Sequence, residues 1–422
     1  MARPCPHFKH LSQTHKPLSL SSVPFLAQRD MPPIPKLSPT ALQFVQAIRS
    51  RKPTLKITRE DHIRGLIQFL ADNNEQYCKS IRGLHFTIGA IEGDVAAMLE
   101  YCIETWGKLM PLKWLRFEDA EGLLVSGLEL PQAFAALETV KHIYMNNVGP
   151  SACDMLLKMR SSLISADLCL SDGQKCSPDE KCYSDPIYLL SASQDTLIKL
   201  KACDATTDTP ENHRQQYPHL HTLKLDCVDK PCTTDYVVAF PALRSLTIVS
   251  AIPYSRRDVF AKCEEYRKAN QEQQRQYGSW TKGLAVVTGP LFDVYALGLC
   301  CSVDVMKLAI TLASEGVYHT MLRAVVEDSL PPVLELMTDP DTIIDDGLIY
   351  ALDGETIRNF HFMHLKITIN VDRDIYGHRV KDTRVRTLST IVVYTIERLI
   401  VAASSRSTLS EPFVVSRSTN FI

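Results

Sequence analysis

The chain has 422 residues, of which 45% are hydrophobic and 22% are charged. That composition and length predict about one to three globular domains with a buried core, and the low glycine count of 17 argues against a collagen-like or glycine-rich disordered chain. The formal net charge is −2, so bulk charge indicates neither a nucleic-acid partner nor an anionic membrane. The two most apolar segments are interrupted by Asp293 and by Glu397 with Arg398, and we therefore expect no membrane-spanning helix.

Both ends of the sequence differ in composition from the middle. Residues 1–53 contain nine of the 24 prolines and are basic, which predicts a disordered N-terminal tail. Residues 1–29 hold no acidic residue, so an organelle transit peptide is an alternative, as is a true start at Met31. Residues 404–422 are rich in Ser, Thr and Arg, and we expect a flexible C-terminal tail.

The cysteines indicate a reducing compartment. There are 13 of them, an odd number, and many lie in apolar surroundings, as at Cys102, Cys169, Cys300 and Cys301. Because free cysteine commonly packs as a small hydrophobic residue, we expect reduced thiols rather than a disulfide framework. The sequence also lacks an apolar run of signal-peptide length near its start, so a cytoplasmic or nuclear protein is expected.

A short motif recurs between the two tails: an apolar residue, two spacers, and then an apolar–x–apolar strand. Clear copies lie at 112–117, 140–145, 220–225 and 243–248, with weaker copies at 163–170 and 197–202. The anchors of successive copies are 23 to 32 residues apart, taken as Leu84, Leu115, Ile143, Leu168, Leu200, Leu223 and Leu246. Leucine-rich repeats have this strand motif and a period of about 20–29 residues.

A strand with one apolar face cannot bury that face alone, whereas stacked copies form a parallel sheet that helices can close. Segments of helical periodicity alternate with the strand motifs, at 61–71, 95–106, 150–163, 318–326 and 388–402. Later strands are expected around Leu308, Leu336 and Leu365. The sequence therefore predicts an α/β fold over residues 54–403, an irregular leucine-rich-repeat-like solenoid with a curved parallel sheet and outer helices.

One charged segment, 255–280, interrupts the repeat period. Val259, Cys263 and Tyr266 form a narrow apolar stripe within it, which predicts an inserted amphipathic helix followed by a polar loop. Two unrelated α/β domains divided at this segment are the alternative. The strand motif occurs on both sides of the insert, which favours one interrupted solenoid.

Four common phosphate-binding and catalytic motifs are absent from the sequence. It contains no G-x-x-x-x-G-K-[ST], G-x-G-x-x-G, G-x-S-x-G or H-E-x-x-H, so we expect a non-enzymatic protein with no cofactor and no catalytic residues. Metal candidates are weak: Cys227 and Cys232 with the preceding His213, His219 and His221, the pair Cys176 and Cys182, and the aspartate-rich run 339–347. Exposed turns and packed thiols are the favoured interpretation, and no metal is expected.

The candidate site is a surface. In the strand motif, the residues between the buried leucines face the concave side of the sheet, where solenoids commonly bind partners. We expect protein binding there, although ordinary solvated polarity is the alternative for any single residue. The candidate binding residues are Trp114, Arg116, Lys224, Thr247, Lys307, Glu335 and Lys366, with His85, Thr222 and Ser245 on the same face.

Several segments resemble one group of proteins: the helix 66–70 leading into 81–86, and the stretches 217–225, 240–246 and 295–303. Over residues 54–403 the chain is similar to basidiomycete fungal F-box-type proteins with degenerate leucine-rich-repeat-like regions. The resemblance implies a helical F-box that binds the Skp adaptor of a cullin ubiquitin ligase, and repeats that recruit a substrate. The nearest F-box segment, 33–48, lacks the usual leucine-proline-x-glutamate opening.

These observations together predict a protein–protein interaction scaffold, with substrate recognition in a cullin-type ubiquitin ligase implied by the resemblance. Two alternatives remain open. One is an orphan repeat protein without a ligase role, and the other is an enzyme or metal site on the Cys/His loops. The expected partners are other proteins, and neither nucleic acid nor a membrane is expected.

Overall fold

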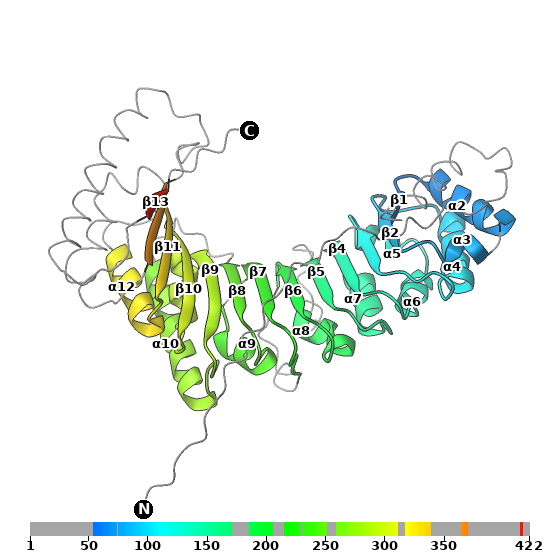
Figure 1. Cartoon of the computed structure of the whole chain (residues 1–422). Helices are drawn as coiled ribbons and strands as arrows, with labels where there is room; N and C mark the ends of the chain where they lie inside the picture. The colour runs from blue at the N-terminus through cyan, green and yellow to red at the C-terminus, as the bar shows by residue number, and fades with distance from the viewer. Residues whose placement is uncertain are drawn as a thin grey trace, which may run out of the picture.

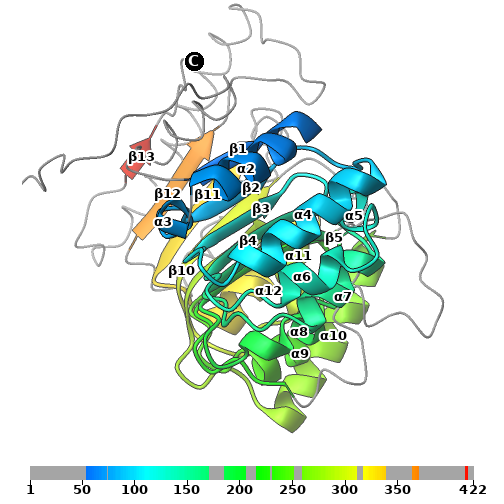
Figure 2. The ribbon, with the colours of Figure 1, turned by 90° about the vertical axis from the view of Figure 1, so that its right-hand side faces the viewer.

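The computed structural model describes residues 54–73, 75–170, 185–205, 215–228, 231–250, 259–310, 317–338, 364–369 and 414–416. They form one sheet of thirteen strands whose spatial order is the order in the chain. Every pairing in that sheet is parallel. The sheet bends into an arc, and the helices lie along one of its faces (Figures 1 and 2).

The strands are β1 (Thr54–Ile57), β2 (Gly83–Phe86), β3 (Trp114–Phe117), β4 (His142–Val148), β5 (Ser165–Leu170), β6 (Lys199–Cys203), β7 (Thr222–Val228), β8 (Ser245–Ser250), β9 (Leu284–Pro290), β10 (Val303–Ile310), β11 (Val333–Thr338), β12 (His364–Ile369) and β13 (Val414–Ser416). The helices are α2 (Glu60–Asn73), α3 (Glu75–Cys78), α4 (Gly93–Trp106), α5 (Ala120–Leu124), α6 (Leu130–Ala135), α7 (Pro150–Leu157), α8 (Pro186–Leu189), α9 (Thr233–Ala239), α10 (Val259–Tyr277), α11 (Leu291–Leu297) and α12 (Tyr318–Ser329).

The core consists of apolar side chains aligned from strand to strand beneath the helices. One row is in register over twelve strands and is buried throughout, comprising Leu55, Leu84, Leu115, Ile143, Ala166, Leu200, Leu223, Leu246, Val287, Met306, Leu334 and Leu365. Side chains alternate between faces along a strand, so the residues between them point away from the helices. The predicted curved parallel sheet with outer helices is confirmed.

Two of the predicted strand anchors are wrong, because each lies two residues away from the residue that aligns with the neighbouring anchor. Ala166, not Leu168, aligns with Ile143, and Ile367, not Leu365, aligns with Leu336. A shift of two residues keeps the same side chains on the buried face, so hydrophobic pattern alone does not separate the two registers.

Residues 404–422 were expected to form a flexible C-terminal tail. Within them, however, Val414–Ser416 forms strand β13, which pairs with β12. A strand of three residues is too short to show a periodic pattern. Several other expectations lie outside the described residues: the tail 1–53, the helix 388–402, the run 339–347, the pair Cys176 and Cys182, and His213.

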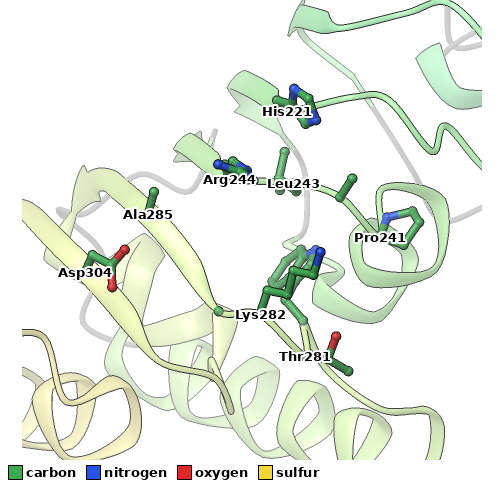
Figure 3. A pocket seen from close by; sticks show the side chains of 11 residues that line it. His221, Pro241, Leu243, Arg244, Thr281, Lys282, Ala285 and Asp304 are labelled. Atoms are coloured by element: carbon green, nitrogen blue, oxygen red, sulfur yellow. The ribbon is translucent and has the colours of Figure 1, made fainter. Parts of the chain in front are cut away.

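The charged segment does not divide the fold. β8 and β9 flank it in sequence and pair directly with each other, so one sheet runs across the insertion and the two-domain alternative is wrong. The segment forms helix α10, which packs against α9 and α11. Val259 and Cys263 are buried and Tyr266 is partly buried, as the apolar stripe predicted. The chain returns to the sheet beside a recess of about 460 Å³ lined by Trp280, Lys282 and their neighbours (Figure 3).

Helix α10 is fixed in place by buried amides that bond to main-chain groups of neighbouring segments. Asn270 is 5% exposed; its Nδ2 donates to the carbonyls of Pro231 (2.8 Å) and Ala296 (2.9 Å), and its Oδ1 accepts from Thr233 N (3.1 Å). Gln274 Nε2 donates to the Gly298 carbonyl (2.7 Å). These bonds satisfy main-chain groups at the ends of short helices, which would otherwise be buried without partners.

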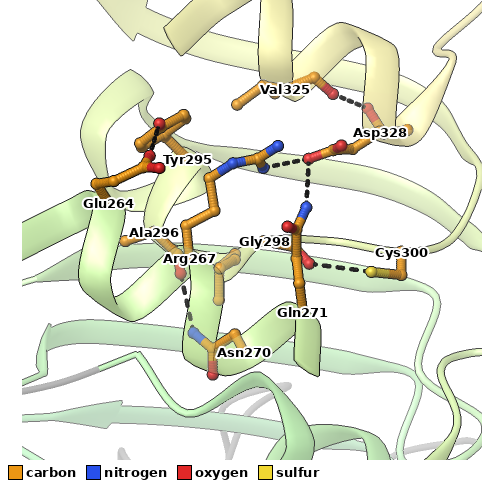
Figure 4. A network of polar contacts seen from close by, with 12 residues as sticks. Glu264, Arg267, Asn270, Gln271, Tyr295, Ala296, Gly298, Cys300, Val325 and Asp328 are labelled. Carbon is orange, nitrogen blue, oxygen red and sulfur yellow. Dashed lines mark hydrogen bonds and ion pairs between the residues drawn. The ribbon is translucent and has the colours of Figure 1, made fainter. Parts of the chain in front are cut away.

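A second polar contact joins α10 to α12. The Arg267 guanidinium forms an ion pair with Asp328 and lies 5.0 Å from the centre of the Tyr295 ring (Figure 4). Gln271 Nε2 also donates to Asp328 (3.1 Å). Gly298 follows α11 at a φ of +53°, where a Cβ atom would lie 2.6 Å from the Arg267 carbonyl oxygen. Only glycine allows α10 to approach this closely.

We expect Asn270→Ala to lower the free energy of unfolding by about 2–4 kcal/mol, because it leaves buried main-chain donors and acceptors without partners. Urea unfolding measures the change. Gln276→Ala is the matched control, since Gln276 lies on the exposed side of α10 and donates a hydrogen bond to Glu272 on the same helix. Equal stability of the two variants would show that the hydrogen bonds of Asn270 make no net contribution to the stability of the fold.

Candidate functional site

A continuous row of side chains crosses the face of the sheet that the helices leave open. It is in register from β1 to β12 and comprises Lys56, His85, Arg116, Tyr144, Asp167, Lys201, Lys224, Thr247, Thr288, Lys307, Glu335 and Lys366. Six of the seven candidate binding residues lie in this row, which we call the central row. The seventh, Trp114, lies two residues earlier on β3. The structure thus brings all seven to one face, and their role in binding stays a prediction.

Among the described residues of this face, Trp114 is the most exposed large aromatic side chain. It belongs to the row that precedes the central one, with His142, Ser165, Lys199, Thr222 and Ser245. Its ring stacks on His142 at 3.8 Å between centroids and 15° between planes, yet 53% of the residue remains exposed. His142 Nδ1 is 2.8 Å from the Ser165 hydroxyl, which fixes the imidazole and therefore the indole above it.

Arg116 and Tyr144 continue this aromatic and cationic cluster in the central row. The Arg116 guanidinium carbon lies 4.1 Å from the centre of the Tyr144 ring. Arg116 Nε donates to Glu118 (2.8 Å), and the same carboxylate oxygen lies 2.9 Å from His85 Nε2. Partial burial raises the pKa of Glu118, but the hydrogen bonds from His85 and Arg116 outweigh it and bring that pKa below its ordinary value.

Ion pairs follow along the rest of the face. They join Lys201 to Asp167 (3.2 Å), Lys224 to Asp226 (3.1 Å), and both Lys307 (3.2 Å) and Lys366 (3.8 Å) to Glu335. Such partly exposed pairs contribute little to stability. Among the described residues, Lys56 and Lys199 have no acidic partner, so the face carries more positive than negative charge.

The recess beside α10 adds charged groups near the starts of strands β7 to β10. His221, Arg244 and Lys282 lie around it together with Asp304 (Figure 3). Its lining is shared by the segments before β7 and β8 and by the loop that follows α10. Groups of both signs surround an open recess, so its shape alone indicates no particular ligand.

Of the metal ligands that the sequence singled out, the side chains of His219, His221 and Cys232 lie within the described residues. His219 and His221 are exposed, while Cys232 is buried directly before α9. Within the described ranges, the one cluster of potential metal ligands is Cys169, Cys203 and Asp204. Burial, followed by hydrogen bonding with Asp204 and Cys169, raises the pKa of the Cys203 thiol above its ordinary range. The sequence analysis missed this cluster because its two cysteines are 34 residues apart and meet only through strand register.

Comparison with known proteins does not assign this chain to a family. No profile of a known protein family matches the chain, and a search of curated proteins likewise finds no match. Among the described residues, no helix has both the length and the apolar character needed to cross a bilayer.

We expect the His142 imidazole to titrate below pH 6.5, the ordinary value, because burial and then the charge of Lys199 lower its pKa. A lowered pKa in the folded state means that the neutral ring stabilises the fold. That contribution is present above pH 6.5 and is lost as the pH falls through the folded-state pKa. NMR titration of the ring protons, assigned with His142→Gln, measures the midpoint.

Lys199→Met should raise that midpoint, whereas Lys158→Met, at the exposed end of α7, should leave it unchanged. A midpoint at or above 6.5 in the wild type would contradict the partial burial of His142 beneath Trp114.

Proposed function

We propose that this chain is a non-enzymatic protein-interaction scaffold of leucine-rich-repeat-like architecture, whose concave sheet face binds an acidic segment of a partner protein. The observation that carries the proposal is the exposed Trp114 ring, fixed by His142 and set among cations of the open face. Tryptophan, tyrosine and arginine are the side chains that most often dominate the energy of protein interfaces.

The geometry near β3 and β4 supports an anchor point for such a partner. Trp114 presents a flat, preorganised apolar surface, so little side-chain entropy is lost when it is covered. Arg116 is stacked on Tyr144 and keeps one edge of its guanidinium in reach of solvent. Lys199 lies two strands from His142 in the same row and has no acidic partner among the described residues.

Charge supports the acidic character of the partner. Four carboxylates of the face already lie beside cations: Glu118 beside Arg116, Asp167 beside Lys201, Asp226 beside Lys224, and Glu335 beside Lys307. The remaining positive charge attracts an acidic segment over about 10 Å at ordinary salt and accelerates its encounter with the sheet.

The leucine-rich-repeat identity rests on three features: the strand motif, the chain-order parallel sheet and the repeat spacing. The narrower role as a substrate receptor of a cullin ubiquitin ligase rests on the resemblance alone. The segment that would bind the adaptor, 33–48, lies outside the described residues.

We expect Trp114→Ala to weaken partner binding at least about tenfold, since an interface anchor contributes about 2 kcal/mol or more. Tagged wild type and variant are compared by quantitative mass spectrometry of co-purified proteins, followed by measured affinities for the partners found. Tyr101→Ala is the matched control, because Tyr101 is a similarly exposed aromatic (59%) on helix α4.

A second matched pair tests the charge argument. Lys199→Glu on the sheet should remove the same partners, and Lys158→Glu after α7 should retain them. If both sheet variants keep the wild-type set of partners, or if the helical-face controls lose it equally, the concave face is not the binding surface.

If the chain serves a cullin ligase, the tagged full-length protein should co-purify with the Skp adaptor and cullin in near-equal amounts. Deletion of residues 1–53 should abolish this association and leave the Trp114-dependent partners in place. A pull-down that contains those partners but neither ligase subunit would remove the ligase role and retain the scaffold.

A further inference from the structure

Strands β5 and β6 bring two cysteines together on the open face of the sheet. Cys169 and Cys203 are direct partners in the parallel register and lie one position beyond the ion pair of Asp167 with Lys201 on that face. Neighbouring strands are about 4.8 Å apart, so aligned side chains on one face are in contact range. Both cysteines are partly exposed, unlike the cysteines buried in the helical layer, Cys78, Cys102, Cys153 and Cys263.

Asp204 adds a carboxylate to the two thiols. It directly follows β6 and has a left-handed backbone (φ +55°), an uncommon conformation for a residue other than glycine. Its N–H donates to the Asp226 carbonyl on the next strand (3.0 Å), which holds this turn. As a result the carboxylate folds back over the sheet, with Oδ2 at 3.3 Å from Cys203 Sγ and 3.9 Å from Cys169 Sγ.

These three atoms have the spacing of a metal coordination sphere, since all of them lie within 4.8 Å of one another. In tetrahedral zinc sites, bonds of about 2.3 Å to sulfur and about 2.0 Å to oxygen place the two ligand atoms about 3.5 Å apart. The two sulfur–oxygen distances here, 3.3 and 3.9 Å, bracket that value.

We propose that Cys169, Cys203 and Asp204 form a binding site for a thiophilic divalent cation of the Zn²⁺ type. Binding forms two metal–thiolate bonds and one metal–carboxylate bond, and it releases the two thiol protons to solvent. The donor set favours zinc over magnesium or calcium, because those harder cations select oxygen ligands only.

Three protein ligands leave a fourth tetrahedral position for water or for a donor from a bound molecule. Asp226 aligns with Cys203 on the neighbouring strand, where its carboxylate is 3.1 Å from Lys224 Nζ. The surrounding charges are therefore already paired, with Asp167 beside Lys201 and Asp226 beside Lys224. Only the cluster itself would carry excess negative charge once its thiols ionise, and a dication neutralises it. This site does not depend on the proposed partner function.

The test uses the reduced full-length protein after removal of bound metal. Zinc is titrated in the presence of a chromophoric chelator, and cobalt is titrated as a spectroscopic substitute. We expect a cobalt spectrum with the thiolate-to-metal absorption of tetrahedral coordination, and a zinc site lost in Cys169→Ser and Cys203→Ser. Affinity should fall by more than about 100-fold, since changes outside the ligand shell already cost about 10- to 100-fold.

Asp204→Asn supplies a variant that tolerates the left-handed backbone and replaces the carboxylate by a poor zinc ligand. It should weaken zinc binding while leaving the circular dichroism spectrum unchanged, which separates ligand loss from misfolding. Cys300→Ser, at an exposed cysteine between α11 and β10, and the double variant Cys227→Ser/Cys232→Ser are the controls and should bind as the wild type does.

Three results would overturn the site: zinc binding unchanged in both Cys169→Ser and Cys203→Ser, loss of binding only in the Cys227/Cys232 double variant, or a cobalt spectrum without thiolate absorption. A Cys169–Cys203 disulfide that forms in air and whose reduced form binds no zinc would also overturn it.

Discussion

The whole structure depends on the burial of strands that have only one apolar face. The described strands are three to eight residues long. From β1 to β12, each strand aligns a buried side chain with that of the next strand in the chain. Parallel pairing in chain order makes each strand's stability a property of its two neighbours and of the helices that cover them. The open face is a consequence of the same arrangement, because every residue between two buried ones must point away from the helices. The packing of the core therefore determines which residues form the candidate surface.

Helix α10 shows how such a sheet accepts a long insertion. β8 and β9 remain paired across it, so the inserted residues do not interrupt the sheet. The helix lies in the covering layer, where its polar residues meet the ends of α9, α11 and α12. Asn270 and Gln274 are buried amides, and both find main-chain partners. A charged sequence is thus compatible with a buried position when its amides replace the hydrogen bonds that short helices leave unmade.

Much of this architecture could be predicted from the sequence, because strand alternation and helical periodicity are local signals. The strands around Leu223 and Leu246, the helix α4 and the concave positions of Trp114 and Lys224 follow from spacing alone. Other features depend on contacts that local patterns do not encode. The register of strand pairing decides which apolar residue of β5 aligns with Ile143; it is Ala166 and not Leu168. β9 was missed because Ala285, Gly289 and Pro290 obscure its alternation, and the Cys169–Cys203–Asp204 cluster exists only through pairing of distant segments.

The bonds that span several repeats have a mechanical consequence. Along most of the arc, side chains bond to the adjacent strand or helix. A small change in curvature can therefore be distributed over many contacts between neighbouring repeats. From α9 to α12, however, bonds such as Thr233 Oγ1 to the Leu297 carbonyl and Arg267 to Asp328 join segments more than 60 residues apart in the chain. We therefore expect this part of the arc to be stiffer than the repeats that carry Trp114.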